Sequence, residues 1–423
     1  WGEMKYDYSE ESNWDNTFYF DAFDIVDDKS LETEFTYTPN DKHTITSGFQ
    51  VKDIGFNLGL ILGTSWLGED SISISMKDTV LWMDQPSQEM GLYIQDKWHI
   101  TSRLSTQLGF RLSTASAHEG IFSDPRVGLK YLIDDDTSLK LNWGRYHQFM
   151  TIANPQDENL RFIDIWMAIP EENKIPFSDH TILGIEHLSA KNILYRLEVY
   201  HKSFDNLITL KQGNLFLEGD DGMIQFSPFN DFYETDAYAY GLEGFIQKKA
   251  GTVTGWAAYT YAVTRWKTEL HDWYAPKFDR PHILNIVGDW QWTPKTHIGL
   301  TVSYATGNPY TEVQGRIQNW GEKYWINYLN WWQRDGLLVG EKNAARFPDY
   351  FRIDVNFTKR KSLKNGGFRE WYFQIINVTN HLNALMYIYD TEYDEQTGQA
   401  LGMRRAGLPM FPIFPTFGMR IQF

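Results

Sequence analysis

The stretch that decides the fold is Phe411-Pro-Ile-Phe-Pro-Thr-Phe-Gly-Met-Arg-Ile-Gln-Phe423, at the end of the chain. From Phe417 onward apolar and polar residues alternate, which predicts a β-strand with one apolar and one polar face. A strand that faces lipid on one side and a wet lumen on the other explains this pattern and also the final, untailed Phe423. An edge strand of a soluble sandwich is the alternative interpretation.

The composition narrows the class of protein. The chain has 423 residues, 16% of them aromatic, and no cysteine, which excludes disulfides and thiolate metal sites. The net charge of −16 makes nucleic acid an unsuitable partner. The mean hydropathy of −0.46 resembles that of a soluble protein, but the polar lumen residues of a barrel dilute its apolar ones. The chain opens on Trp1 with neither methionine nor signal peptide, so we interpret it as a mature or truncated piece.

The rest of the chain repeats the alternating pattern. Residues 30–423 contain about fifteen alternating segments, most near the length of roughly 9–11 residues that crosses a bilayer at a tilt. Residues 1–29, acidic and aromatic, are predicted to be an extracellular loop. Turns of a few residues alternate with long loops, predicted at 57–87, 113–124, 147–178, 209–234, 264–280, 306–348 and 381–410. This segregation of loop length predicts an all-β, transmembrane antiparallel barrel with short periplasmic turns and long extracellular loops.

The alternation also predicts which residues face lipid and which face the lumen. Phe351, Ile353, Val355, Phe357, Met419 and Ile421 are expected on the lipid side. The lumen is expected to carry the charged residues Lys130, Lys140, Arg352, Asp354 and Arg420, as solvated or paired charges. Aromatic girdles are expected near the short turns, at Tyr37, Trp98, Trp290 and Trp292.

Five segments along the chain carry a family resemblance. They are Gly91–Trp98 (GLYIQDKW), Leu197–Ile208 (LEVYHKSFDNLI), Asp279–His282 (DRPH), Trp371–Asn380 (WYFQIINVTN) and Phe414–Gly418 (FPTFG). In this order they resemble the barrel of TonB-dependent outer-membrane receptors. The last strand also resembles the C-terminal assembly signal of outer-membrane barrels, on Phe417, Met419, Ile421 and Phe423.

The resemblance implies a barrel of 22 strands with a plugged lumen. Residues 1–423 would be its C-terminal fifteen or so strands, without the plug domain, the energy-coupling box and the first strands. Either a separate N-terminal fragment completes it or the sequence begins part-way through the polypeptide. The implied partners are that plug and those strands, the TonB complex of the inner membrane acting through the plug, the barrel assembly machinery and outer-membrane lipid; no cofactor is implied.

The function implied is capture of a scarce nutrient, such as a siderophore-iron complex, and its energised import across the bacterial outer membrane. Iron chelate, cobalamin, oligosaccharide and peptide all stay open as the substrate. A surface adhesin or structural barrel without transport is the alternative, and a plain porin would use fewer strands. No catalytic motif is present, and the spacing of His187, His201 and His282 fixes no catalytic geometry, so the chain is predicted not to be an enzyme.

Loop 306–348 holds the candidate ligand-binding residues: Trp320, Tyr324, Trp325, Tyr328, Trp331, Trp332 and Arg334. Aromatic rings beside polar side chains suit the stacking of a planar or sugar-like ligand. Loop-on-loop packing of a short amphipathic helix explains the same spacing equally well. No metal site is predicted, because the acidic clusters fit solvated loop charge better than the oxygen ligands of a divalent cation. These clusters are Asp24 to Asp28, Asp220–Asp221, and Glu392 with Asp394–Glu395.

Overall fold

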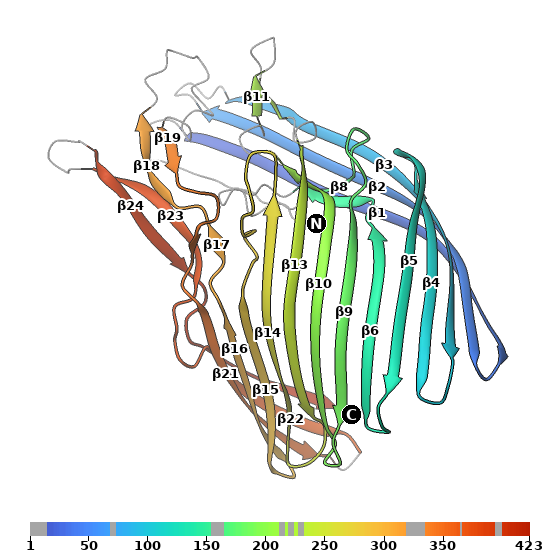
Figure 1. Ribbon diagram of the computed structural model, residues 1–423. Helices are drawn as coiled ribbons and strands as arrows, with labels where there is room; N and C mark the ends of the chain where they lie inside the picture. The colour runs from blue at the N-terminus through green and yellow to red at the C-terminus, as the bar shows by residue number, and fades with distance from the viewer. Residues whose placement is uncertain are drawn as a thin grey trace. The chain divides into compact units, whose positions relative to one another are not determined.

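The computed structural model describes residues 15–67, 73–153, 165–210, 216–218, 224–226, 232–318, 335–363, 366–393 and 400–423 (Figure 1). Every regular element in these ranges is a β-strand. No helix in these ranges is long and apolar enough to cross a membrane.

Fifteen strands form one antiparallel sheet, which confirms the predicted fold class and strand number. In order across the sheet they are β1 (Asp15–Asn40), β2 (His43–Leu67), β3 (Ser73–His99), β4 (Leu104–Ala115), β5 (His118–Leu132), β6 (Thr137–His147), β9 (Phe177–Leu188), β10 (Ile193–Leu210), β13 (Phe232–Lys248), β14 (Val253–Lys267), β15 (His282–Thr293), β16 (Thr296–Ala305), β21 (Tyr350–Ser362), β22 (Phe368–Ile376) and β25 (Phe414–Gln422). Within the described residues β1 and β25 are the two ends of this order and do not pair with each other.

The long connections contain short β-strands that pair two by two. They pair as β7 (Met150–Ala153) with β8 (Ile165–Ala168), β11 (Phe216–Glu218) with β12 (Ile224–Phe226), β17 (Pro309–Tyr310) with β20 (Ala345–Arg346), β18 (Val313–Gln318) with β19 (Asp335–Val339), and β23 (Ala384–Tyr393) with β24 (Ala400–Pro409). All five pairs fall inside segments predicted as long loops. The opposite connections are tight, as at Ser189–Ile193, where Asn192 adopts a left-handed conformation (φ 57°) that asparagine tolerates.

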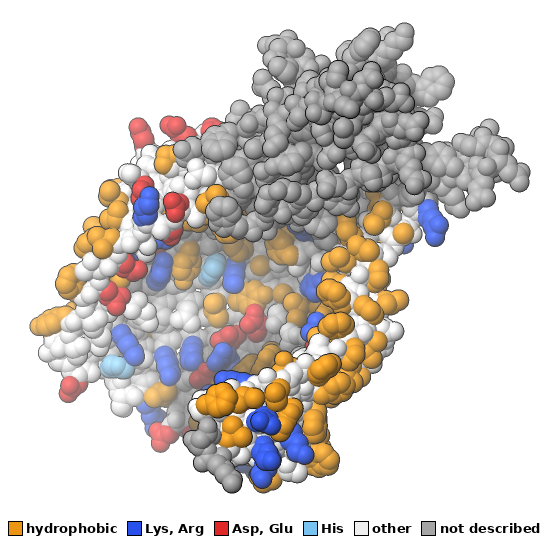
Figure 2. Space-filling model, turned by 180° about the vertical axis from the view of Figure 1, so that it is seen from behind, with side chains coloured by type: hydrophobic (Ala, Val, Ile, Leu, Met, Phe, Trp, Pro, Cys, Tyr) orange, Lys and Arg blue, Asp and Glu red, His pale blue; other side chains and the backbone are white. Residues whose placement is uncertain are grey.

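The register of the strands keeps apolar residues on one face. Leu300 on β16 lies opposite Val355 on β21, and Val355 lies opposite Ile375 on β22. Many large apolar side chains on the strands are exposed, Leu92 by 63% among them, which would be an aggregation hazard in water. Figure 2 shows basic and acidic side chains together on the sheet face that it views, and hydrophobic side chains gathered along the strip at its right-hand edge.

The chain divides into two compact units. Unit 1 comprises Trp1–Lys130, Asn142–Thr181 and Lys202–Ala237; unit 2 comprises Tyr131–Leu141, Ile182–His201 and Tyr238–Phe423. In unit 1, Ile54 and Phe56 on β2 form a small buried cluster with Ala168 on β8, against which Met150 packs. The buried groups of unit 2 lie mainly where its strands lead into loops, and these groups build the site described below.

Several segments predicted as loops are strands. β1 begins at Asp15, so the prediction that residues 1–29 form a loop is wrong for residues 15–29, and the predicted loops 57–87 and 113–124 are mostly strand. The β1–β2 pairing runs from Asp15 opposite Leu67 to Asn40 opposite His43. With 26 residues, β1 far exceeds the length that a bilayer requires. Ladder hydrogen bonds continue beyond that length, where no lipid selects apolar residues, so composition alone gives no strand signal there.

Candidate functional site at the loop ends of unit 2

Asp279, from the Asp279–His282 motif, is the buried centre of the loop ends. Its carboxylate side chain is only 1% exposed, and it accepts a hydrogen bond from the Thr264 backbone N–H at 2.8 Å. It also binds the guanidinium of Arg346, while that of Arg265 lies 3.6 Å away. Arg346 in turn donates to the backbone carbonyls of Asp279 and Gly307. One carboxylate therefore joins the end of β14, the start of β15 and the short strand β20.

An aromatic cluster lies beside this network. Tyr310, which is 3% exposed, has its ring centre 4.6 Å from that of Phe347, and Phe347 stacks on Tyr387 at 4.7 Å. The guanidinium of Arg405 lies 4.5 Å from the centre of the Tyr387 ring. Arg405 also donates to the phenol oxygen of Tyr310 at 2.8 Å and to Glu312 at 3.3 Å. We call these five side chains the Arg405 cluster.

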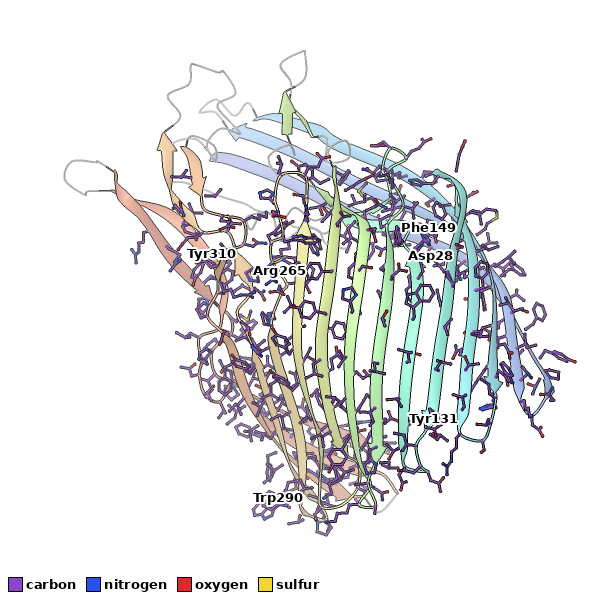
Figure 3. All side chains as sticks on the ribbon, in the orientation of Figure 1. Asp28, Tyr131, Phe149, Arg265, Trp290 and Tyr310 are labelled. Carbon is purple, nitrogen blue, oxygen red and sulfur yellow. The ribbon has the colours of Figure 1, made fainter. Side chains whose placement is uncertain are left out.

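The Arg405 cluster holds a partly exposed ion pair, in which the Arg405 guanidinium is paired with the Glu312 carboxylate. Burial raises the pKa of the Tyr310 phenol, against the opposing charge of Arg405, so Tyr310 stays protonated at neutral pH. The side chain of Arg405 is 43% exposed although it contacts Tyr310, Glu312 and the Tyr387 ring. A guanidinium on a rigid aromatic base suits recognition of an anionic, planar ligand. Figure 3 places Tyr310 and Arg265 at one end of the unit 2 strands and Trp290 at the other, beside the β15–β16 turn.

The Trp371–Asn380 motif forms a second network. Asn377 is fully buried and left-handed (φ 54°), and its backbone N–H donates to the Asp354 carboxylate at 2.9 Å. Its side-chain amide donates to the carbonyl oxygens of His381 and Phe411. Asp354 also binds Arg352 on the same strand. The asparagine thus ties β21 and β22 to the segment that leads into β25.

Three of the five predicted lumen charges, Lys140, Arg352 and Asp354, are found in such pairs. Arg352 binds Asp354, and Lys140 binds Glu186 at 3.2 Å, which Arg196 also reaches. Of the histidines weighed for catalysis, His187 bonds Thr137 and His282 bonds Tyr259. Among the described residues, no group of three or more His, Asp or Glu side chains is arranged to hold a metal ion. Asp220, Asp221, Asp394 and Glu395 lie outside the described residues.

The structure describes some of the predicted site residues and not others. Trp320, Tyr324, Trp325, Tyr328, Trp331, Trp332 and Arg334 all lie outside the described residues. In β25, Phe417 lies opposite Phe373 and Met419 opposite Trp371, so the apolar face of the last strand continues that of β22. Ile421 lies opposite Arg369, and Phe423 is 89% exposed. Their role as an assembly signal stays a prediction. Sequence reasoning missed the Arg405 cluster, whose members lie up to 95 positions apart and share no motif.

The fold defines a class: an antiparallel sheet with an apolar outer face, a charged inner face, tight turns at one end and long loops at the other is the wall of a transmembrane β-barrel. Residues 2–380 match the family described as TonB dependent receptor-like, beta-barrel. The chain belongs to this family, and it is a protein of the bacterial outer membrane. Its relatives are receptors and transporters rather than enzymes. No curated protein sequence matches the chain.

Solved structures share the fold. The ferric citrate transporter FecA in its unliganded form has a TM-score of 0.58 at 9% identity, covering 97% of this chain and 56% of that one. The ferripyoverdine receptor of the outer membrane of Pseudomonas aeruginosa has 0.53 at 13%, covering 99% and 51%. The ferric-catecholate import receptor Fiu from Escherichia coli K12 has 0.54 at 11%, covering 96% and 65%. The chain therefore spans between about half and two thirds of the length of these proteins.

Proposed function

We propose that this chain is the wall and the outer loops of a receptor that binds a scarce nutrient at the cell surface and imports it with energy from the TonB complex. The match of residues 2–380 to the receptor barrel family carries the proposal. The remaining strands, a plug domain inside the barrel and the TonB complex acting on that plug are the partners that this function requires. The barrel assembly machinery and outer-membrane lipid complete the proposed set.

A negatively charged metal chelate is the proposed nutrient, with a siderophore-iron complex as the leading example. The exposed guanidinium of Arg405, held by Tyr387, Tyr310 and the comparably exposed Glu312 carboxylate, supports an anionic ligand with planar groups that takes the place of Glu312. The similar structures include receptors whose names refer to ferric citrate, ferripyoverdine and ferric catecholates, which are chelates of this chemical kind.

Import is tested in an iron-starved strain that lacks the natural receptor. Restoring the receptor should restore growth on the cognate ferric chelate, and an uncoupler that discharges the inner membrane should abolish uptake while surface binding persists. Binding with no energised uptake would contradict the transport proposal and favour the adhesin.

Arg405→Gln is expected to weaken chelate binding about tenfold, which corresponds to roughly 1.4 kcal/mol. The change removes the cation but keeps a polar side chain that can donate hydrogen bonds, and hydrogen bonds to charged groups contribute about 1.5–3 kcal/mol. Binding of ferric citrate and of a ferric tris-catecholate to receptor-bearing cells measures the effect. Arg404→Gln is the matched control, because Arg404 lies opposite Asp390 in the β23–β24 ladder while Arg405 lies opposite Tyr389. Equal affinities for the two variants would remove Arg405 from the ligand site.

The aromatic residues of loop 306–348 are the second proposed contact with the ligand. If its rings stack on the chelate, replacing Trp325, Trp331 and Trp332 with alanine should weaken uptake while barrel abundance stays normal. Each lost stacking contact contributes about 0.5–1.5 kcal/mol beyond area burial. Normal uptake together with new protease sensitivity of the loops would instead support loop-on-loop packing, and no change in either measurement would contradict both interpretations.

A further inference from the structure

The apolar face of unit 2 is interrupted by a groove of about 420 Å³. Its walls are apolar and aromatic side chains on β9, β10, β13, β14 and β15: the exposed Ile185, Tyr195, Leu197, Ile246 and Tyr259, and the half-buried Leu284. Two small residues of the two central strands form its floor, Gly244 on β13 and Ala257 on β14. The groove exists because these two positions lack the bulk of their neighbours.

The backbone does not require glycine at the floor. A Cβ added to Gly244 would meet no atom closer than the Tyr259 carbonyl oxygen, at 4.0 Å. Gly241 on the same strand is different, because its Cβ would lie 2.5 Å from the Tyr261 carbonyl oxygen and 2.6 Å from the Tyr200 hydroxyl. Close packing therefore explains Gly241 but leaves Gly244 open to a side chain. A larger side chain at Gly244 is therefore sterically permitted, and local backbone packing does not require the groove.

Most of the groove lies toward the tight turns of the sheet. His187 is the penultimate residue of β9, Tyr195 is the third residue of β10, and Ile246 comes two residues before the end of β13. The rings of His187 and Tyr195 stack at 6.3 Å, and His187 also bonds the Thr137 hydroxyl. Imidazole and phenol groups thus stand at the turn end, where lipid headgroups meet water. From there the lining is mainly aliphatic, through Leu197 and Ile246, up to Tyr259, whose hydroxyl bonds His282, and to Leu284, the third residue of β15.

We propose that this groove binds one phospholipid of the periplasmic leaflet, with an acyl chain over Gly244 and Ala257 and the headgroup beside His187 and Tyr195. The groove opens on the face that lipid already covers in an outer-membrane barrel, so hydrocarbon is the available occupant. Tight turns face the periplasm in such barrels, and the periplasmic leaflet is built of phospholipid. The mainly aliphatic lining between His187 and Tyr259 matches an acyl chain, and the nearby tight turns place the headgroup at the His187 end. The lipid fills a void that would otherwise leave its lining without contacts.

The test uses the natural receptor that carries this chain, in vesicles of phosphatidylethanolamine and phosphatidylglycerol with a trace of phosphatidylcholine that is spin-labelled near the end of one acyl chain. The double variant Gly244→Leu/Ala257→Leu fills the groove. Electron paramagnetic resonance should show about one motionally restricted chain per protein fewer than in the unchanged receptor. Native mass spectrometry from mild detergent should show loss of one retained phospholipid.

Leu300→Phe is the control, because Leu300 lies on the same apolar face, on β16, and does not line the groove. The control should keep both signals. Heat-modifiable migration on gels verifies that each variant is folded, and Ala257→Leu alone serves as the milder filling if the double variant does not fold. An unchanged number of restricted chains in a folded filling variant would overturn the proposal, and so would an equal loss in the control.

Discussion

Replacing Asp279 with alanine is expected to destabilise the loop ends of unit 2 by about 3–5 kcal/mol, the range for removing one partner of a buried ion pair. The carboxylate is 1% exposed and is the counter-charge of Arg346, with Arg265 within 4 Å. Without it, both guanidinium groups lose their carboxylate partner, and the Thr264 N–H loses its acceptor. The thermal midpoint of the purified receptor should fall, and limited proteolysis should cut within residues 264–280 and 306–349.

Asp272→Ala is the matched control for this prediction. Asp272 lies in the same connection, but its side chain is 86% exposed and its contact with Lys267 is long, at 3.8 Å. Exposed pairs of this kind contribute little, so the control should leave the thermal midpoint and the protease pattern unchanged. If the Asp279 and Asp272 variants behaved alike, the buried carboxylate would not organise these loops.

Val355→Arg is expected to reduce the folded receptor in the outer membrane. Val355 lies between Leu300 and Ile375 on the apolar face, and an arginine at the bilayer midplane of a barrel costs about 2–4 kcal/mol. Heat-modifiable migration and the urea midpoint in lipid vesicles measure the loss. Thr358→Arg places the same side chain on the other face of β21, opposite His297 and Tyr372, and should be tolerated. Normal assembly of the Val355 variant would contradict the register of the sheet.

The sheet could be predicted from sequence because its signal is local. The alternation around Val355 needs no distant information, and β21 carries it over the whole bilayer span. The strand ends could not be predicted in this way. Asp15–Lys29 is acidic, yet it pairs residue by residue with β2, because backbone ladders hold outside the membrane whatever the side chains are.

The candidate site could likewise be predicted from the sequence only in part. Asp279 and Asn377 fall in segments that carry the family resemblance, but only the folded chain shows their partners, Arg346 and Asp354. The Arg405 cluster gave no signal at all, since Tyr310 and Arg405 are 95 positions apart and meet only when β17 and β24 are placed by the sheet. The physical limit is the same in each case: pairwise contacts between loops depend on strand order, which a linear pattern does not contain.

The strand order has a consequence for how freely the outer loops can vary. Each strand of the sheet pairs with the strand nearest to it in the chain once the small loop hairpins are set aside, so every connection closes a single hairpin. The entropic free-energy cost of closing a flexible loop rises only by about 0.6 kcal/mol for each doubling of the loop length. The connection between β16 and β21, residues 306–349, is therefore only a few kcal/mol more costly to close than the two-residue turn between β15 and β16. Recognition of a new ligand can thus arise by exchanging or lengthening an outer loop while the hydrogen-bonded wall beneath it stays unchanged.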